Sequence, residues 1–328
     1  MTNLAISARD VRDAADLLRG VAVRTPLLEN AALNARMGRR VLIKFEGAQH
    51  GGAFKFRGAY NRLARIAPER RKAGVVAWSS GNHALGVATA ARMLGMPATI
   101  VMPADAPAIK VAGTRVLGAE ILPYDRFTQS REEIATALAE ERGATLVPSF
   151  DDPLVMAGQG TVGLEIMEQA AEAGAALSAI LVCCGGGGLI AGVATAVRNA
   201  MPDVAIYSVE PAGFDDTARS LASGRREAVA PDARSICDAL LAPMPGALTF
   251  PVNRALLAGG LVVTDAQVRT AMRYAFETLK LVVEPGGAVA LAALLHDLAP
   301  PSDAPIAIVL SGANVDAAPY AAIMQGTD

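Results

Sequence analysis

One lysine stands in a setting that could give it chemistry. Lys55 lies between Phe54 and Phe56, after the Gly51-Gly52 pair and before a stretch with the apolar spacing of a helix. Apolar neighbours and a helix start both disfavour a charged ammonium, so they lower the pKa of the amine and make it nucleophilic. A lysine prepared in this way can form a Schiff base with a carbonyl compound. The alternative is a lysine whose methylene stem is buried while its charge reaches water.

A second feature is Gly185-Gly186-Gly187-Gly188, which follows an unbroken apolar run and precedes a small-residue helix. Bare amide groups and the positive end of a helix can bind a phosphate, although a close-packed turn would need glycine too. No Gly-Lys-Ser/Thr closes the stretch as in a P-loop, and its spacing does not match the dinucleotide fingerprint. A phosphate site and a buried lysine without a nucleotide motif together indicate pyridoxal 5′-phosphate, whose ring is an electron sink.

Composition excludes several other classes of protein. The chain has 328 residues, 52% of them hydrophobic and 19% charged, with 30 basic against 32 acidic side chains and a net charge of −2. Nothing in this balance points to nucleic acid or an anionic membrane, and 4% aromatic residues leave few side chains for stacking on bases. We expect no signal peptide and no membrane span. The three cysteines, of which Cys183 and Cys184 are adjacent, form no disulfide framework and are expected to be core residues of a reduced, cytoplasmic protein.

The elements that must hold these features alternate between strand and helix, which predicts a parallel α/β architecture. Strands are predicted at 41–45, 75–78, 98–102, 119–122, 145–147, 179–184, 205–209 and 306–310. Helices are predicted to begin at Ser7, at Lys55 and near Thr264, and to cover 82–94, 109–117, 130–142, 159–172 and 188–197. A hinge is predicted at 151–153 and an irregular region at 213–249.

Taken together, the motifs resemble those of the fold-type II pyridoxal-phosphate enzymes, in the branch of the serine/threonine dehydratases and serine racemases. The resemblance follows the family's order over nearly the whole chain. Its motifs are Arg24-Thr25-Pro26-Leu27, Phe54-Lys55-Phe56-Arg57-Gly58-Ala59, Ser79-Ser80-Gly81-Asn82-His83, Ala157-Gly158-Gln159-Gly160-Thr161, residues 185–189, Glu284-Pro285 and Ser311-Gly312-Ala313-Asn314-Val315-Asp316.

The resemblance implies a fold and a cofactor site. The fold would be the two-domain, tryptophan synthase β-like one, with residues 74–153 forming a small α/β domain inserted into a large domain of residues 1–73 and 154–328. Lys55 would carry the cofactor as a Schiff base and act as the base at the substrate Cα. Ser311 would face the pyridine nitrogen as a neutral group, which favours β-elimination over transamination. The other cofactor-binding residues would be Phe54, Asn82, Gly185, Gly186, Gly187, Gly188, Leu189 and Glu284.

The resemblance also implies contacts with the substrate. Ser79, Ser80, Gly81, Asn82 and His83 would surround the substrate carboxylate. In racemases of this group the serine matching Ser80 reprotonates the face opposite the lysine, so its presence permits racemisation.

Two further groups come from the racemase-like members. Glu210, the carbonyl of Phe214 and Asp216 resemble their divalent-cation site and would suit Mg²⁺ or Ca²⁺, the alternative being an acidic loop that binds nothing. Arg131 would reach the distal end of the substrate, where its guanidinium suits a second carboxylate. The alternative for Arg131 is a solvated arginine paired with nearby glutamates.

Two departures from the family's pattern bear on specificity and regulation. The family often has Thr-Gly-Ser before Phe-Lys, whereas this chain has Gly51-Gly52-Ala53, which lacks that serine hydroxyl near the cofactor phosphate or substrate. No regulatory domain is expected after Ser311, so feedback control by isoleucine is not expected. A homodimer is expected from the resemblance.

The function predicted is that of a pyridoxal-phosphate ammonia-lyase, which converts serine, threonine or 3-hydroxyaspartate to a 2-oxo acid and ammonia by α,β-elimination. A racemase of serine or aspartate type is the nearest alternative. A catalytically silent ligand-binding relative is a third, but such a protein need not keep Lys55, Asn82 and Ser311 together.

Overall fold

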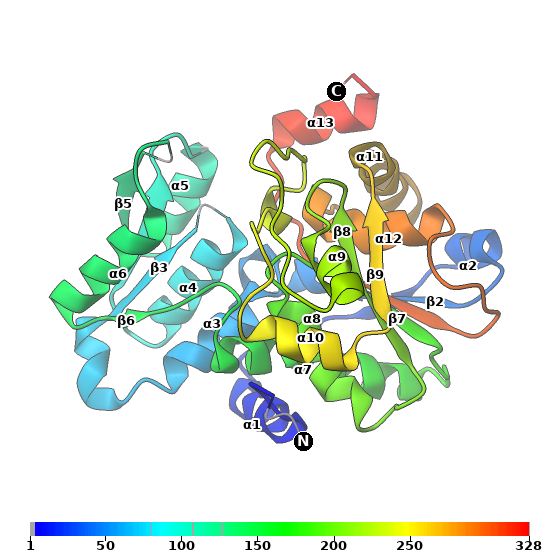
Figure 1. Cartoon of the computed structure of the whole chain (residues 1–328), viewed down its shortest axis with the longest axis horizontal. Coiled ribbons are helices and arrows are strands. Elements are labelled where there is room, and N and C mark those ends of the chain that lie inside the picture. Colours follow the sequence, from blue (N-terminus) through cyan, green and yellow to red (C-terminus); the bar gives the residue numbers. More distant parts are fainter. Residues whose placement is uncertain (1–3, 80, 107, 126, 328) are drawn as a thin grey trace.

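The computed structural model describes residues 4–79, 81–106, 108–125 and 127–327. Two sheets form separate lobes, with a six-stranded sheet in one and a four-stranded sheet in the other (Figure 1). The predicted parallel α/β architecture is therefore confirmed. Among the described residues, no helix is both long and apolar enough to cross a bilayer.

The six-stranded sheet has the order β1-β2-β10-β7-β8-β9. Every neighbouring pair is parallel except β1 and β2. The chain steps one way from β7 to β8 and the other way from β9 to β10. Because crossovers between parallel strands are right-handed, this reversal puts α8 on one face and α11 and α12 on the other (Figure 1). The strands are β1 (Leu27–Glu29), β2 (Val41–Phe45), β7 (Ala179–Cys183), β8 (Ala205–Pro211), β9 (Gly259–Val263) and β10 (Ile306–Leu310).

The helices of this lobe differ in how far they are buried. Helix α12 is buried at every position, which fits its almost wholly apolar sequence. The helices of this lobe, α12 included, are α1 (Ala8–Leu18), α2 (Ala31–Met37), α3 (Lys55–Ala64), α7 (Pro153–Glu172), α8 (Gly188–Arg198), α9 (Asp216–Ser223), α10 (Thr249–Leu256), α11 (Asp265–Tyr274), α12 (Pro285–Leu295) and α13 (Ala317–Gln325). Short 3₁₀ turns are η1 (Glu46–Ala48), η2 (His50–Gly52), η3 (Pro68–Ala73) and η4 (Asp238–Leu240), and η5 (Ala275–Leu279) is a π-helix.

The four-stranded sheet is parallel throughout, with the order β5-β4-β3-β6. Its strands are β3 (Val75–Trp78), β4 (Ala98–Pro103), β5 (Glu120–Tyr124) and β6 (Thr145–Leu146). Alternate residues of β3 face opposite sides of the sheet. Val75 and Ala77 pack with α3 and α4 (Asn82–Met93), while Val76 packs with α6 (Arg131–Arg142). Helix α5 (Ala108–Val116) completes the lobe. All four strands fall within residues 74–153; the division into two domains at those bounds stays a prediction.

Local sequence explains where several helices start. Ser7 caps α1, and its hydroxyl accepts from the backbone N–H of Asp10 while the Asp10 carboxylate accepts from the N–H of Ser7. Thr264 and Gln267 make the same reciprocal pair at α11, and Ser130 caps α6. These three starts were predicted and are confirmed.

One prediction of local structure was wrong. Helix α7 begins at Pro153, with Asp152 as its cap, so the predicted hinge is part of a helix start. The first half of α7 was not predicted because residues 155–163 are buried on every side and show no amphipathic period. The region 213–249 is rich in loops, as predicted, and it also contains α9 and η4.

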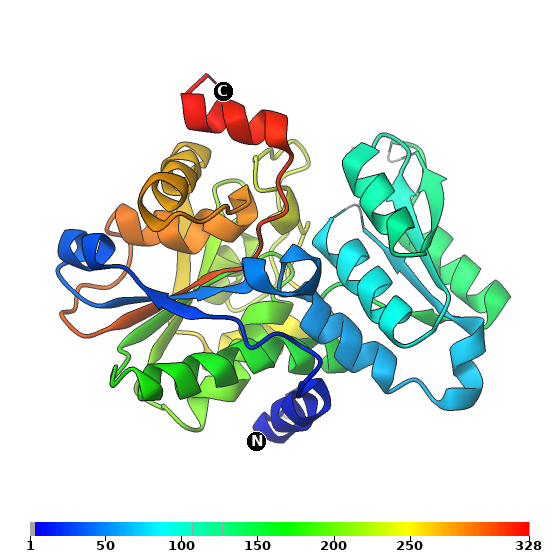
Figure 2. The same cartoon turned by 180° about the vertical axis from the view of Figure 1, so that it is seen from behind.

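Helix α3 joins the two lobes (Figure 2). Phe56, Ala59 and Leu63 are part of the four-stranded sheet's core. On another side of α3, Gly58 lies against α7: a Cβ added at Gly58 would come 2.7 Å from the carbonyl oxygen of Val155. Lys55 is the first residue of this helix, as predicted.

Candidate active site

The carboxyl ends of both sheets open onto a cavity of about 670 Å³. This is where ligands bind in open α/β sheets, because helix N-termini and loops converge there. From the predicted set, the cavity is lined by Phe54, Lys55, Ser79, Gly81, Asn82, His83, Arg131, Gly185, Gly186, Gly187, Gly188, Leu189, Glu284 and Ser311. Ser80 lies outside the described residues. Glu210, Phe214 and Asp216 do not line the cavity.

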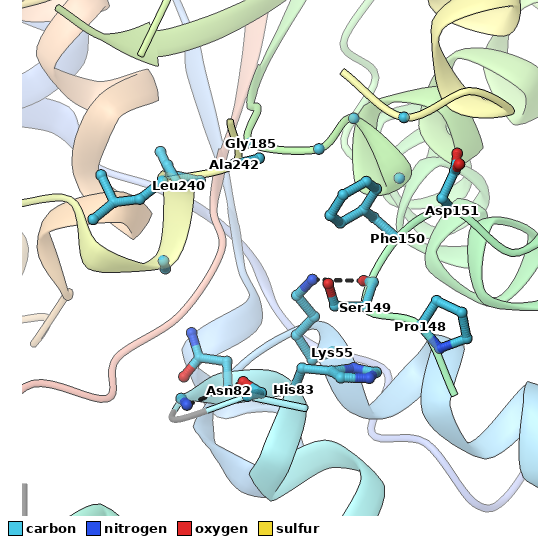
Figure 3. Close-up of a pocket in the computed structure, with 18 of the residues that line it drawn as sticks. Lys55, Asn82, His83, Pro148, Ser149, Phe150, Asp151, Gly185, Leu240 and Ala242 are labelled. Carbon is cyan, nitrogen blue, oxygen red and sulfur yellow. Dashed lines mark hydrogen bonds between the residues drawn. The ribbon is translucent and has the colours of Figure 1, made fainter. Parts of the chain in front are cut away.

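Lys55 reaches into the middle of this cavity (Figure 3). The chain just before it is fixed to the six-stranded sheet: Ala53 forms an antiparallel bridge with Gly312, and the N–H of Phe54 donates to the carbonyl of Ser311 at 3.1 Å. The Nζ atom of Lys55 donates to the carbonyl of Ser149 at 2.8 Å. Poor solvation at this depth lowers the pKa of Lys55 to about 8. The amine is thus oriented and unusually ready to act as a base or nucleophile.

Ala53, where the family often has serine, is buried against Gly312 and is not one of the residues that line the cavity. A Cβ added at Gly312 would lie 3.1 Å from the Ala53 methyl group.

The glycine stretch connects β7 to α8 and needs glycine for two separate reasons. Gly187 has a φ of +89°, a conformation that side chains with a Cβ avoid. Gly186 and Gly188 lie against Phe150, so added Cβ atoms would approach that residue to 2.4 Å and 3.0 Å respectively. The bare amides and the N-terminus of α8 form a concave surface that suits a phosphate.

Ser311 and Glu284 form the wall next to Lys55, at the end of β10 and the start of α12. Both are 3% exposed. Burial raises the pKa of the neighbouring Cys183 thiol to about 11. Ser311 and Cys183 are therefore both neutral at physiological pH, so no carboxylate faces the cavity at Ser311.

Asn82 is held in place from both ends of its amide. Its Nδ2 donates to Glu284 at 2.5 Å, and its Oδ1 accepts from Nδ2 of Asn314 at 2.8 Å. The Asn314 amide also donates to the carbonyl of Gly51 at 2.6 Å. This chain of hydrogen bonds crosses from the four-stranded lobe to the six-stranded lobe.

The ring of His83 is held by the protein and is neutral. Its ring Nε2 bonds the carbonyl of Val147 at 2.9 Å, and its Nδ1 is buried without a partner. Burial, followed by the charge of Lys55, lowers the pKa of His83 to about 3, so the ring is neutral. A ring that already donates to Val147 has no second N–H for an anion. The amides in the first turn of α4 remain available by their position.

Arg131 opens α6 on the opposite side of the cavity and is exposed. Ser130 caps the helix, so the start of α6 is fixed while the long arginine side chain keeps its freedom.

Glu210 and Asp216 lie together behind the glycine stretch. The Glu210 carboxylate accepts from the N–H groups of Thr217 at 2.9 Å and Ala218 at 2.8 Å. Burial and the charge of Asp216 raise the pKa of Glu210 to about 8, and burial raises that of Asp216 to about 7. The Oδ2 atom of Asp216 is buried without a partner. A bound cation would give that oxygen a partner and offset the repulsion between the Glu210 and Asp216 carboxylates. The two side chains therefore suit a cation. The described residues contain no group of three or more His, Cys, Asp or Glu side chains that could hold a metal.

Ser149 and Phe150 also belong to the site but were not predicted from the sequence. They follow β6 at the carboxyl edge of the smaller sheet. The rule that ligands gather at carboxyl ends of parallel strands could have found them.

A buried ionic network lies beneath Lys55. The guanidinium of Arg57 pairs with Glu46 at 2.8 Å and with Glu165 at 2.6 Å, and Lys44 pairs with Glu165 at 2.6 Å. Arg57 also donates to the hydroxyls of Thr25 and Thr161. Buried charges are costly unless paired, so two acids matched to two bases hold the first turn of α3 against α7 and β2.

The fold and this cavity define an α/β enzyme built around a lysine and a glycine-rich loop that suits a phosphate. A model of the pyridoxal-phosphate dependent enzyme family matches residues 18–312, and the chain belongs to that family. Its cofactor is therefore pyridoxal phosphate.

Two relatives are named L-threo-3-hydroxyaspartate ammonia-lyase. The protein from Pseudomonas sp. is 45% identical over 320 residues, covering 98% of this chain and 99% of that protein. The one from Saccharomyces cerevisiae is 40% identical over 319 residues, covering 97% and 96%. Among solved structures, maize serine racemase superposes with a TM-score of 0.91 at 38% identity, covering 98% of each chain. The predicted family and fold type are confirmed.

Proposed function

We propose that the protein is a pyridoxal-phosphate dependent ammonia-lyase that converts 3-hydroxyaspartate to a 2-oxo acid and ammonia. The main support for this reaction is Lys55, whose amine has a pKa of about 8 and donates to the carbonyl of Ser149. The same cavity is lined by the glycine stretch 185–188. The substrate is supported by the two relatives named for it and by Arg131 on the cavity wall.

The cofactor would be held by this chain's residues at three points. The amides of 185–189 would bind its phosphate, with Phe54 beside Lys55 on the cavity wall. Asn82, fixed by Glu284 and Asn314, would hydrogen-bond the ring hydroxyl. Ser311 would face the ring nitrogen, and its neutral hydroxyl leaves that nitrogen uncharged. When bound, the cofactor supplies an electron sink for the pair released at the substrate Cα.

Lys55 would carry the proton transfers. In its neutral form it takes the proton from Cα, and it then returns a proton to the departing β-hydroxyl so that water leaves. The Ser149 carbonyl fixes the direction of Nζ for both steps. The C–N bond is then lost to water, which gives the 2-oxo acid and ammonia.

The substrate would be bound at its two ends by the smaller lobe. Ser79, Gly81 and the main chain of Asn82 and His83 would receive the α-carboxylate at the N-terminus of α4. Ser80 would join them; it lies outside the described residues. Arg131 would bind the distal carboxylate as a charge-assisted pair.

A divalent cation, Mg²⁺ or Ca²⁺, would be bound by Glu210, the carbonyl of Phe214 and Asp216. Support comes from the unpartnered Asp216 Oδ2 and from the raised pKa values of both carboxyl groups. Carboxylate and carbonyl oxygens are the ligands that these hard cations prefer.

We further propose a cytoplasmic homodimer. The three described cysteines are buried and free, which suits a reducing compartment. Phe276 and Val282 are exposed large apolar residues, and Phe276 packs edge-on to Tyr320 of the C-terminal helix α13. The molecular mass in solution tests the oligomeric state.

The test of function is a panel of β-hydroxy amino acids, assayed for release of 2-oxo acid and for change of enantiomer. We expect L-threo-3-hydroxyaspartate to give the highest kcat/KM for 2-oxo acid release. A second candidate, racemase activity, is favoured by Ser80 in the sequence and by the similarity to maize serine racemase. Inversion that outpaces 2-oxo acid release on every substrate would reject the lyase in favour of the racemase.

A further inference from the structure

Helix α10 lies directly behind the glycine stretch and hydrogen-bonds its carbonyl groups. The Thr249 hydroxyl donates to the carbonyl of Gly186 at 2.7 Å, and the Asn253 amide donates to that of Gly187 at 3.4 Å. The N–H of Gly246 also donates to the Gly186 carbonyl, at 3.2 Å. Thr249 and Asn253 are both 0% exposed, so these polar side chains are buried for this contact.

Holding a carbonyl fixes the amide on the other side of the same peptide. In a planar trans peptide the C=O and the next N–H point in opposite directions. When the Gly186 and Gly187 carbonyls point toward α10, the N–H groups of Gly187 and Gly188 point away from it, toward the cavity. Glycine peptides rotate easily, so the peptide between Gly186 and Gly187 depends on Thr249 and Gly246 for its direction. The Gly187 carbonyl also accepts from the N–H of Ala191 in α8 at 3.0 Å, so Asn253 adds to a direction that α8 already favours.

Helix α10 is itself anchored by the segment that holds Lys55. Leu248, the N-cap residue, supplies no side-chain cap. The carboxylate of Asp151 accepts instead from the N–H groups of Ala247 at 2.9 Å, Leu248 at 2.8 Å and Thr249 at 3.2 Å. Residues 149–151 therefore contact the lysine through the Ser149 carbonyl, the glycine stretch through Phe150, and α10 through Asp151 (Figure 3).

We propose that Asp151, Thr249 and Asn253 are positioning residues that set the direction of the phosphate-binding amides. All three act through the glycine stretch, and of the three only Asp151 lines the cavity. This inference rests on the proposed placement of the cofactor phosphate at residues 185–189.

The test compares two ligands that differ by the phosphate alone. Apoprotein is titrated with pyridoxal phosphate and with pyridoxal, and binding is followed by the fluorescence of Trp78, the one tryptophan, which lines the cavity. We expect Thr249→Val to weaken pyridoxal phosphate binding about three- to tenfold, the range of one lost hydrogen bond, and to leave pyridoxal binding unchanged. Thr249→Ser, which keeps the hydroxyl, should restore the wild-type ratio.

Matched controls separate positioning from general destabilisation. Thr195→Val removes a similar hydroxyl bond, to the carbonyl of Ala191 at 2.8 Å, within α8. Asp152→Ala removes the cap of α7, where Asp152 accepts from the N–H groups of Leu154 and Val155. Both controls should lower thermal stability without changing the ratio of the two affinities, whereas Asp151→Asn should change it. Asn253→Ala should change the ratio in the same direction as Thr249→Val and by a smaller factor, which keeps the test valid if one variant fails to fold.

The outcomes distinguish this inference from the proposed function. Wild-type protein that binds pyridoxal as tightly as pyridoxal phosphate would overturn both. If wild type prefers the phosphate and Thr249→Val, Asn253→Ala and Asp151→Asn keep that preference in full, the positioning roles are overturned and the proposed function stands. The ³¹P resonance of the bound cofactor gives a second readout, and we expect it to shift in Thr249→Val and to stay unchanged in Thr195→Val.

Discussion

The two walls of the cavity differ in how firmly their side chains are held. On the side of the six-stranded sheet, Ser311 and Glu284 are 3% exposed and the glycine stretch is backed by α10. On the side of the four-stranded sheet, Asn82 and His83 are also buried and hydrogen-bonded, whereas Arg131 is exposed. A wall fixed by burial suits the cofactor, which is the same for every substrate. A more open wall suits recognition of a variable ligand and closure around it.

Lys55 lies where the two walls meet, so its removal should have the largest effect. We expect Lys55→Ala to lower kcat by about 10³-fold or more, because it removes both the attachment point and the base. Borohydride reduction followed by peptide mass analysis should fix the cofactor on Lys55 in the wild type and on no peptide of the variant. Lys72→Ala, at an exposed lysine of η3, should leave kcat unchanged. Cofactor still covalently fixed in Lys55→Ala would show that the lysine is misassigned.

Arg131 tests whether the open wall selects the substrate. Arg131→Ala should lower kcat/KM for 3-hydroxyaspartate about 10- to 100-fold, the value of one charge-assisted pair, and leave that for serine nearly unchanged. Arg142→Ala, at the other end of α6, is the control, since Arg142 pairs with Glu120 at 2.6 Å. An equal loss on both substrates would contradict a distal-carboxylate contact and make the two walls less distinct.

The lowered pKa of Lys55 gives a pH dependence. The neutral amine attacks the cofactor aldehyde, and with a pKa of about 8 the neutral fraction rises from about a tenth at pH 7 to about nine-tenths at pH 9. The rate of cofactor attachment to apoprotein should therefore rise nearly tenfold over that interval and then level off. Dividing by the rate for a free lysine derivative at each pH removes the cofactor's own ionisations. If the rate divided by that of the free lysine derivative stays constant up to pH 10, the pKa of Lys55 is not lowered.

Removal of a cation should have the smallest effect, because Glu210 and Asp216 lie outside the cavity. We expect chelation to lower the melting temperature by a few degrees and Mg²⁺ or Ca²⁺ to restore it, since a ligand stabilises the state it binds. Glu210→Gln should abolish the response. An identical melting temperature in chelator and in Mg²⁺, with no metal found by elemental analysis, would remove the cation site.

The sequence was informative where chemistry and structure depend on neighbours along the chain. Lys55, the glycine stretch and the helix caps at Ser7, Ser130 and Thr264 are local patterns, and each lies in the kind of element predicted for it. Ser149, Thr249 and Asn253 act on residues far away in the chain, and no local pattern marks them. The start of α7 was missed for a related reason: glycines that let α7 approach α3 and α8 also erase its amphipathic period.

The ionic network beneath Lys55 draws all its members from outside the four-stranded lobe. Arg57, Glu46, Glu165 and Lys44 precede residue 74 or follow residue 153, as do Thr25 and Thr161. The anchor of the first turn of α3 is therefore independent of that lobe, whereas the Lys55 amine also depends on Ser149, which belongs to it. An exchange of that lobe for a related one, with Ser149 and the Phe56, Ala59 and Leu63 face of α3 retained, should change substrate preference while the first turn of α3 keeps its position. Substrate preference can then vary while this anchor stays the same.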